Sequence, residues 1–325
     1  MTIEPVLWGH RGMGATDSAF ARKLGAHLIR PPEQSLKSLM LVFNHGAQAF
    51  EADSIRTSDD RIVLMHSTRY GEHVAPARHF PDRPFLDQLT LAEIDSQLRL
   101  GEGEGEKVPE LREVLRALSQ KFPDIASAGL VRFNLELKDV QGTPCPRRQP
   151  SLCDLVLRDI REVGFPLDAI RFSSFSLDML AEMREREPAA RLALLTDIGT
   201  DHGGDVGKNI FGVGSAECYR GFNESAINEA QARLGSGLVA IHPEIRTLTD
   251  AGVAHLAVCN LTLATWGWQE FSPLAQSLEG PLFAAAAARA SNLCARHLVE
   301  LVVITDYLED TRKYLRTLNV TSGPI

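Results

Sequence analysis

Three acidic residues in two segments of the chain have the spacing of a cation site. Glu51 and Asp53 follow a short apolar run and stand two positions apart, so on a β-strand both side chains would point to one face. Neighbouring carboxylates repel one another, and a shared cation relieves that repulsion. Glu136 lies in a second short apolar segment. Because these ligands are all oxygens, the sequence predicts one hard cation, Mg²⁺ or Ca²⁺, bound by Glu51, Asp53 and Glu136.

Two histidines and two positively charged side chains accompany these acids. His10 and His66 each follow a short apolar run, and imidazole, with a reference pKa of about 6.5, can exchange protons near neutral pH. Arg11 follows His10 directly, and Lys138 stands two positions after Glu136. We therefore expect an acid–base pair of imidazoles beside positive side chains that can bind an anionic group.

Each of these residues also has a purely structural explanation. A single histidine after a strand can be a hydrogen-bonded structural residue, and Lys138 can pair with the acid two positions before it. Glu51 and Asp53 can form salt bridges with Arg56 or Arg61, which are close in sequence. It is the occurrence of all these groups together, at the ends of successive apolar runs, that favours a site.

The elements that would carry these residues alternate between strand and helix. Alternation of this kind predicts a parallel sheet, and the count fits a (β/α)₈ TIM barrel, whose active site lies at the C-terminal ends of the strands. The run 62–65 is then an added hairpin partner of the second strand. Apolar runs predict strands at 5–8, 47–50, 131–138, 168–173, 191–196, 237–241, 261–266 and 300–305. Periodic apolar residues predict helices from Glu33, at 90–98, 109–121, 151–163, 176–187, 245–258 and 283–297.

The chain, at 325 residues, exceeds the about 250 residues of a minimal barrel. We expect one domain over 1–325 with loop insertions at the C-terminal rim, at about 67–108 and 199–236. The segment 13–30 also falls over the predicted site. The glycine-rich stretch 199–223 lacks periodicity and predicts a long loop or lid.

The composition limits the function classes. A formal charge of −8 argues against a nucleic-acid partner, because phosphate-backbone binders carry a basic surface. The five cysteines are scattered without paired spacing, which predicts neither a disulfide framework nor a zinc site and fits a reducing compartment. The first predicted strand begins by Pro5, which leaves no room for a signal peptide with an apolar core, and no apolar run is long enough for a membrane span. A cytoplasmic location is therefore expected. The oligomeric state is left open.

Several motifs together resemble those of the glycerophosphodiester phosphodiesterases in order and spacing. The resemblance covers most of the chain and is looser between about 199 and 300. It rests on His10-Arg11-Gly12, Pro32-Glu33-Gln34-Ser35, Glu51-Ala52-Asp53, Thr57 to Asp60 before a strand ending in His66, and Leu135-Glu136-Leu137-Lys138. Later matches are Lys107-Val108-Pro109-Glu110-Leu111, Phe172-Ser173-Ser174-Phe175, an aromatic residue near Trp266, and Ile304-Thr305-Asp306-Tyr307.

The resemblance implies a metal-dependent phosphodiesterase that hydrolyses a glycerophosphodiester to glycerol phosphate and an alcohol. His10 and His66 would be the catalytic residues, Glu51, Asp53 and Glu136 the metal ligands. Substrate binding would fall to Arg11, Lys138, Glu33 and Trp266. The nucleophile can be water or a neighbouring glycerol hydroxyl that first forms a cyclic phosphate, and a small-molecule phosphodiester is the expected partner.

The chain departs from the family pattern at two places. It has His66-Ser67 where the family usually has His-Asp, and Gln34-Ser35 where the family has Asn-Thr. The first departure motivates a competing hypothesis, a phosphodiester-binding barrel with weak or no catalysis. The sequence is also compatible with phospholipase D-like action on lysolipids or sugar phosphodiesters, and with a different metal-assisted barrel enzyme such as a lyase or aldolase.

Overall fold

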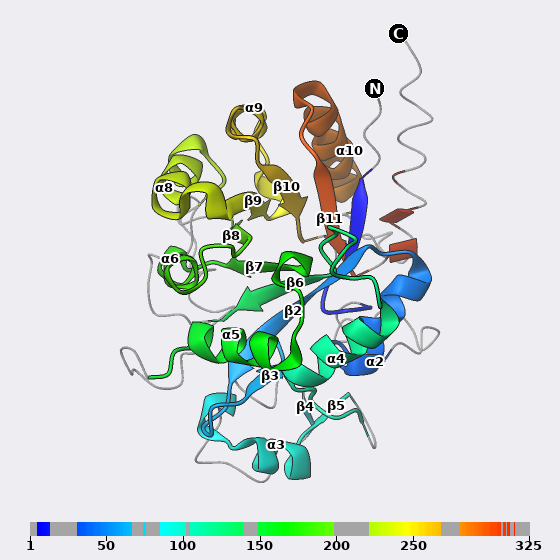
Figure 1. Cartoon of the computed structure of the whole chain (residues 1–325). Coiled ribbons are helices and arrows are strands. Elements are labelled where there is room, and N and C mark those ends of the chain that lie inside the picture. The colour runs from blue at the N-terminus through cyan, green and yellow to red at the C-terminus, as the bar shows by residue number, and fades with distance from the viewer. Residues whose placement is uncertain are drawn as a thin grey trace.

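Parallel strands form a closed barrel in the computed structural model of the chain (Figure 1). Their order around the barrel is β1-β11-β10-β9-β8-β7-β6-β2, and pairing of β1 with β2 closes the ring. The predicted (β/α)₈ barrel is therefore confirmed. The strands are β1 (Val6–Gly9), β2 (Ala49–Arg56), β6 (Phe133–Leu137), β7 (Ile170–Ser174), β8 (Leu192–Thr196), β9 (Leu238–Pro243), β10 (Thr262–Thr265) and β11 (Leu301–Thr305).

The structure describes most of the chain, with gaps. The described residues are 5–13, 31–66, 74–75, 85–101, 105–138, 149–197, 221–267, 280–306, 308–309, 311–312 and 315. Parts of the predicted loops lie outside them, among them most of the segment 13–30, residues 102–104 of the expected insertion at about 67–108, and nearly all of the glycine-rich stretch at 199–223. The loops expected in those segments therefore stay predictions.

The run at 62–65 forms the predicted hairpin partner. Strand β3 (Ile62–Leu64) pairs antiparallel with β2, with Ser54 opposite Leu64. It adds a ninth strand to the sheet without entering the ring of eight. The hairpin extends β2 beyond the C-terminal rim. It also positions the backbone that follows Leu64.

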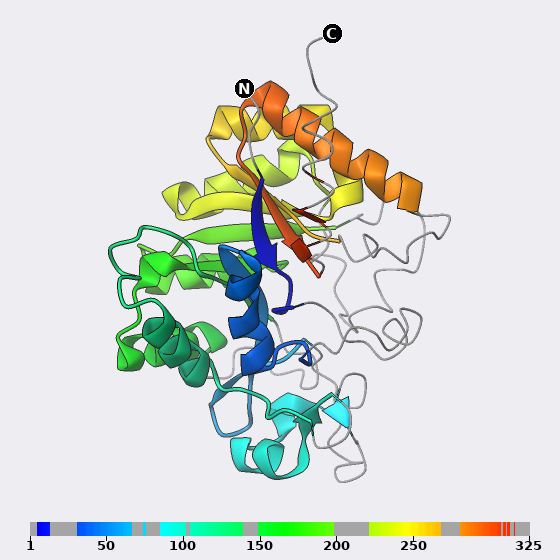
Figure 2. The same ribbon diagram turned by 90° about the vertical axis from the view of Figure 1, so that its right-hand side faces the viewer.

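Helices cover the outside of the barrel (Figures 1 and 2). Most begin at a Ser, Thr or Asn whose side chain accepts a hydrogen bond from a backbone N–H of the first turn, which satisfies one of the unpaired donors there. The barrel helices are α2 (Leu36–Leu41), α4 (Leu111–Lys121), α5 (Leu152–Val163), α6 (Leu177–Arg186), α8 (Glu224–Leu234), α9 (Asp250–Cys259) and α10 (Gly280–His297).

Three of these helices, α8, α9 and α4, differ from what the sequence predicted. Helix α8 was not predicted, because its apolar face is made largely of alanines and its first turn adjoins the glycine-rich stretch. Helix α9 begins at Asp250 and not at 245, because a 3-10 turn (Ile245–Thr247) comes first and Thr249 caps the helix. Helix α4 begins at Leu111, so Pro109 lies before the helix.

The expected insertion at about 67–108 contains a small satellite of secondary structure. Its described parts are β4 (Val74–Ala75), a 3-10 turn (Leu86–Gln88), α3 (Leu91–Gln97) and β5 (Arg99–Leu100). An apolar cluster of its own packs the satellite against the β2–β3 hairpin through Ile55, Val63 and Met65. In both views the satellite lies at the far end of the molecule from α10.

The two faces of each barrel strand have different chemistry. One face of each strand points outward into the main core beneath the helices. Phe50, Phe133 and Phe172 lie on this face. The alternate residues point into the barrel, where Trp8 and Ala264 belong to a small apolar cluster. Above that cluster, toward the C-terminal ends, the interior becomes polar and acidic. This polar end is the position predicted for the site.

Candidate active site

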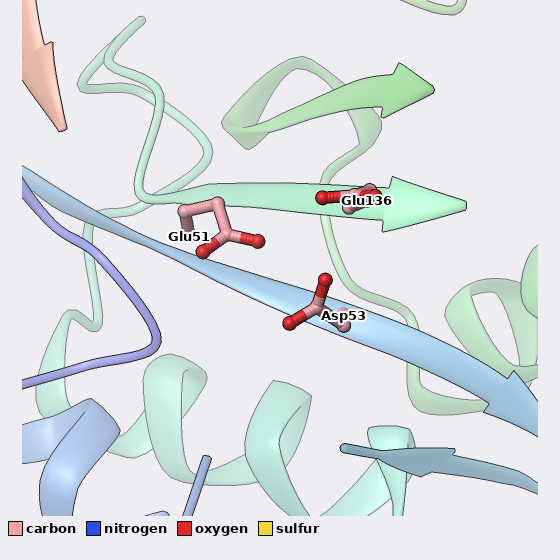
Figure 3. Close-up of side chains that lie close together, drawn as sticks. All are labelled: Glu51, Asp53 and Glu136. Carbon is pink, nitrogen blue, oxygen red and sulfur yellow. The ribbon is translucent and has the colours of Figure 1, made fainter. Parts of the chain in front are cut away.

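The three predicted cation ligands lie together because of strand alternation and register. Glu51 and Asp53 share the inner face of β2, and Asp53 is directly opposite Glu136 in the parallel pairing of β2 with β6. Directly paired residues of adjacent parallel strands point to the same face. Figure 3 shows the three carboxylates turned toward one another. We call Glu51, Asp53 and Glu136 the carboxylate trio.

The trio has the dimensions and chemistry of a cation site. One carboxylate oxygen from each residue lies within 4.8 Å of those from the other two. Glu51 and Asp53 are buried, and Glu51 Oε1 has no hydrogen-bond partner among the described residues. A buried carboxylate oxygen without a donor costs free energy, and a hard divalent cation would supply the missing interaction. The residues present thus fit a Mg²⁺ or Ca²⁺ ion.

Lys138 and Arg11 lie close to different carboxylate oxygens of Asp53. Lys138 Nζ lies 2.9 Å from Asp53 Oδ1 and 3.0 Å from Glu136 Oε1. The Arg11 guanidinium lies 3.8 Å from Asp53 Oδ2 through Nε and 3.4 Å from Glu33 Oε1 through Nη1. Lys138 therefore pairs with Glu136, as the purely structural explanation requires, and with Asp53 as well.

The charges of this cluster do not balance within the protein. The cluster contains four carboxylates, those of Glu33 and the trio, and two positively charged side chains, Arg11 and Lys138. If all six groups are ionised, a net charge of two negative charges remains. Burial, with repulsion from Asp53, raises the pKa of Glu136 to about 7. Burial and the carboxylates of Asp53 and Glu136 raise the pKa of Glu51 well above its usual range. One divalent cation would remove this excess charge.

Asp53 differs from its two neighbours in its protonation. Burial alone would raise its pKa, but Lys138 and Arg11 outweigh burial and lower the pKa below the usual range. The same contacts raise the pKa values of the Lys138 ammonium and the Arg11 guanidinium, against the effect of burial. Asp53 is therefore the member of the trio that is held ionised by the protein itself.

His10 is oriented by an acid from the other end of the chain. Its Nδ1 lies 2.6 Å from Asp306 Oδ1, and its backbone N–H donates to Thr305 O at 2.9 Å. Because β1 pairs with β11, the residues that follow these strands are neighbours at the rim. With Nδ1–H donated to Asp306, the other ring nitrogen, Nε2, is turned toward the trio, 3.9 Å from Glu51 Oε2.

The turn after His10 brings its backbone against the trio. Arg11 has a φ of 49°, and its N–H donates to Glu51 Oε2 at 3.1 Å. Gly12 has a φ of 86°, and a Cβ there would lie 2.8 Å from the backbone carbon of Ser38 in α2. Only glycine combines that conformation with so close an approach. The glycine at position 12 thus follows from the packing of this turn on α2.

His66 stands on the opposite side of Asp53 from β6, at the end of the hairpin. It follows Met65, whose N–H donates to Asp53 O at 3.0 Å, and it is half-buried. The hairpin thereby anchors the backbone before His66 to the strand that carries two of the trio. Ser67, the first of the two departures from the family pattern, lies outside the described residues.

Two aromatic rings, those of Trp266 and Phe175, are in contact after the strands β10 and β7. Trp266 follows β10, which is diametrically opposite β6 in the strand order. Its Nε1 donates to His242 O at 3.0 Å, and its ring meets that of Phe175 edge to face, with centroids 5.9 Å apart. The half-buried Trp266 is thus held at the rim and is not part of the main core.

The salt-bridge explanation for Glu51 and Asp53 is wrong. Arg56 donates to Asp60 at 3.0 Å through Nε, and Arg61 pairs with Glu110. These ion pairs lie around the β2–β3 turn, beyond the rim. Glu33 can also be explained as an acid that favours the N-terminus of a helix, but it lies before Ser35, the residue that caps α2, and its side chain contacts Arg11.

Two residues that contact the site were not among the predicted site residues. Asp306 holds His10, and Gln34 donates to Asp53 from its side-chain amide. Asp306 follows the closing strand directly, as His10 follows the first, so the rule that polar residues at strand ends gather at the rim would have selected it. Gln34 belongs to the Pro32-Glu33-Gln34-Ser35 motif, but its place in a turn, and not at the end of a strand, gives no indication that it contacts Asp53.

In the described part, no helix combines the length and apolar character needed to cross a membrane. Comparison with curated protein sequences gives no match.

Solved structures with the same fold cover nearly the whole chain. A structure assigned as a glycerophosphoryl diester phosphodiesterase from Silicibacter pomeroyi DSS-3 is 20% identical, with a TM-score of 0.68, covering 98% of this chain and 95% of its own. A glycerophosphodiester phosphodiesterase from Parabacteroides distasonis is 17% identical, with a TM-score of 0.63, over 98% and 99%. An Oleispira antarctica phosphodiesterase in complex with the product sn-glycerol-3-phosphate is 18% identical, with a TM-score of 0.62, over 97% of each chain.

At these identities the structural likeness establishes the fold. The activity class comes from the sequence itself, because the model of one enzyme family matches residues 10–267, which include His10, the carboxylate trio and Trp266. The chain belongs to the glycerophosphoryl diester phosphodiesterase family and is a phosphoric diester hydrolase.

Proposed function

We propose that this protein is a metal-dependent phosphodiesterase that hydrolyses glycerophosphodiesters to glycerol phosphate and an alcohol, within a single barrel domain. The observation that carries the proposal is the placement of an Asp-oriented imidazole beside the carboxylate trio, with His10 Nε2 3.9 Å from Glu51 Oε2. Proton transfer and charge neutralisation, the two needs of phosphodiester hydrolysis, are thus met within one small site.

The carboxylate trio would hold a single Mg²⁺ or Ca²⁺ ion. When bound, such an ion supplies positive charge for a phosphoryl oxygen of the substrate. Support for the ion comes from the excess negative charge of the cluster and from the unpartnered Oε1 of Glu51. Ligands made of oxygen alone are those that these hard cations prefer.

His10 would transfer one of the two protons that the reaction moves. Asp306 accepts from Nδ1, so Nε2 is the atom that exchanges a proton with the substrate or the nucleophile. His66 would transfer the other proton, from the hairpin side of the trio. Either imidazole can be the base, and the nucleophile can be water or the neighbouring glycerol hydroxyl.

The remaining site residues would bind substrate. Arg11 and Lys138 contact the trio and bring positive charge to the place where the phosphate must bind. Glu33 would orient the Arg11 guanidinium, because its Oε1 lies 3.4 Å from Arg11 Nη1. Trp266, at the opposite side of the mouth, would pack on the glycerol or alcohol part. The solved Oleispira antarctica complex with sn-glycerol-3-phosphate supports a small phosphodiester as substrate.

A coupled assay tests this proposal. Glycerol phosphate released from a panel of glycerophosphodiesters is measured with the full chain, in Mg²⁺, in Ca²⁺ and in EDTA. We expect turnover that requires the cation and falls about 10²–10⁴-fold in each of His10→Ala and His66→Ala. Turnover that persists in EDTA would overturn the role of the cation, and turnover unaffected by His10→Ala would overturn the mechanism.

A further inference from the structure

Gln34 makes an unusual two-point contact with one member of the carboxylate trio. Its side chain is buried, with 1% of its surface exposed. The amide Nε2 donates to Asp53 Oδ2, and the amide Oε1 accepts from the Asp53 backbone N–H at 3.3 Å. A single side-chain amide therefore holds both the carboxylate and the backbone of Asp53.

The chemistry of the partners fixes which way the amide points. A backbone N–H can only donate, so the atom facing it must be the amide oxygen. The NH₂ group then faces the carboxylate, which is ionised and can only accept. In this orientation both ends of the amide have a hydrogen-bond partner. A flipped amide would instead place its NH₂ group against the backbone N–H of Asp53 and its oxygen against the carboxylate.

With Gln34 in place, both oxygens of Asp53 are engaged. Lys138 Nζ contacts Oδ1 at 2.9 Å, and Gln34 donates to Oδ2. The carboxylate is thereby fixed in rotation about its own axis, because each oxygen has a separate donor. A ligand that is already oriented loses less conformational freedom on binding a cation than one that can rotate.

The backbone of Gln34 joins this clamp to the second acid on β2. Gln34 N–H donates to Arg11 O at 3.0 Å, and Arg11 N–H donates to Glu51 Oε2 at 3.1 Å. The two turns therefore tie Asp53 and Glu51 to one another through a chain of hydrogen bonds. Gln34 is the residue at which this chain meets Asp53.

The side-chain length at position 34 decides whether the clamp forms. Gln34 has a φ of 62°, in the left-handed region where asparagine is more readily accommodated. Asparagine, which the family pattern has here, would suit this backbone better, but its amide is one methylene closer to the main chain. Substitution by asparagine therefore separates the effect on the backbone from the effect on the contact.

We propose that Gln34 is a positioning residue that holds Asp53 in the orientation needed to bind the cation, and so raises the affinity of the carboxylate trio. This inference rests on the proposed function, because it requires that the trio bind a cation. Loss of an outer partner of a metal ligand commonly weakens metal binding by about 10–100-fold. We expect a loss of that size in variants without the clamp.

Calorimetric titration of Mg²⁺ and of Ca²⁺ into the EDTA-stripped and dialysed full chain measures the affinity directly. Gln34→Met keeps the length of the side chain and removes both hydrogen bonds, and Gln34→Asn keeps the amide and shortens its reach. Both should bind about 10–100-fold more weakly than wild type. Gln88→Ala is the matched control, because Gln88 also accepts from a backbone N–H, that of Phe85, but in the satellite. It should bind as wild type does.

A kinetic measurement separates positioning from general damage. If Gln34 acts through Asp53, the cation concentration for half-maximal turnover rises in Gln34→Met, while kcat at saturating cation stays within about threefold of wild type. A folding defect would instead lower kcat at every cation concentration. Thermal unfolding in EDTA, with and without added cation, gives a second readout, because the cation-induced rise in Tm should be smaller in both Gln34 variants.

The outcomes distinguish this inference from the proposed function. Wild-type affinity in Gln34→Met and Gln34→Asn would overturn the role of Gln34 and leave the cation site intact. A kcat defect that excess cation does not restore would also overturn it. If neither the wild-type protein nor Asp53→Asn bound Mg²⁺ or Ca²⁺ in the titration, the proposed cation site would be wrong. The inference about Gln34 would then be wrong as well.

Discussion

The Nδ1 atom of His10 lies 2.6 Å from Oδ1 of Asp306, although the two residues are 296 positions apart. They meet because β1 and β11 are neighbours in the closed barrel and both strands end at the same rim. This contact sets which nitrogen of His10 carries its proton and turns Nε2 toward the carboxylate trio. The first and last strands therefore position His10 together.

Replacing Asp306 by asparagine tests this relationship. An asparagine side chain keeps the shape but can present its NH₂ group to Nδ1, which favours the wrong tautomer of His10 and does not stabilise the imidazolium. We expect kcat to fall by about 10²–10⁴-fold with little change in KM. The pH profile of kcat should shift as well, which a purely structural role would not produce. Normal kcat in a folded Asp306→Asn variant would contradict this assignment.

Lys138 is predicted to have opposite effects on cation binding and on turnover. Its ammonium neutralises Asp53 and Glu136, so removing it leaves the trio more negative and more attractive to a cation. Lys138→Met should bind Mg²⁺ or Ca²⁺ at least as tightly as wild type, yet hydrolyse substrate more slowly and with a higher KM. Titration and steady-state kinetics on one preparation measure both effects. Weaker cation binding would show that Lys138 chiefly orients the carboxylates.

The stabilising effect of the cation should grow with pH. The pKa of Glu136 is about 7 in the folded protein against an ordinary value of 4.5. Between these values Glu136 holds a larger share of a proton in the cation-free folded state than in the unfolded state. Its contribution to stability is therefore fully present below pH 4.5 and is lost as pH rises through about 7. A bound cation replaces that proton. We therefore expect the cation-induced rise in Tm to be larger at pH 8 than at pH 5.

The variant Glu136→Gln supplies the control for this experiment. It lacks the group whose pKa is raised, so its Tm in EDTA should vary less between pH 5 and pH 8 than that of wild type. A cation-induced rise in Tm that was equal at both pH values would contradict the assignment of the trio as the binding site.

Arg171 is predicted to cost stability. Its guanidinium is buried in the barrel interior, 4.8 Å above the Trp8 ring and 3.4 Å from His242 Nε2, and in the described part of the chain no carboxylate pairs with it. Burial lowers its pKa to about 9. Replacing a buried charge by an apolar side chain of similar volume is often neutral or stabilising, so Arg171→Met should raise the free energy of unfolding by about 1 kcal/mol.

Chemical denaturation of the EDTA-treated protein measures that change, with Arg171→Ala as a comparison. The alanine variant leaves a cavity and should be less stable than Arg171→Met by about 2 kcal/mol or more. A methionine variant that lost more stability than the alanine variant would show that the guanidinium makes a favourable interaction inside the barrel.

The sequence determined the barrel and most of its site. Short apolar runs separated by amphipathic helices admit few arrangements, because each strand must bury both faces and each helix one stripe. The i, i+2 spacing of Glu51 and Asp53 places both on one face of β2 whatever the rest of the fold does. The hairpin at 62–65 was also predictable, because a ninth strand cannot enter a ring of eight.

Helix α8 and the starts of α4 and α9 were not predictable in the same way. Alanine-rich faces carry little hydrophobic periodicity, and α9 starts where Thr249 caps it and not where the apolar pattern begins. In such cases tertiary packing, and not the local pattern, selects the boundary.

Contacts between residues far apart in the sequence were decided by the tertiary structure alone. Strand register, which no local pattern specifies, put Glu136 directly opposite Asp53, and barrel closure put Asp306 against His10. The left-handed turn at Gln34 placed its side-chain amide on Asp53, a contact that the motif around Gln34 does not specify. Residue types and spacing tell which side chains can do chemistry. Which of them touch depends on the register of eight strands, which is fixed only when the barrel closes and its core packs.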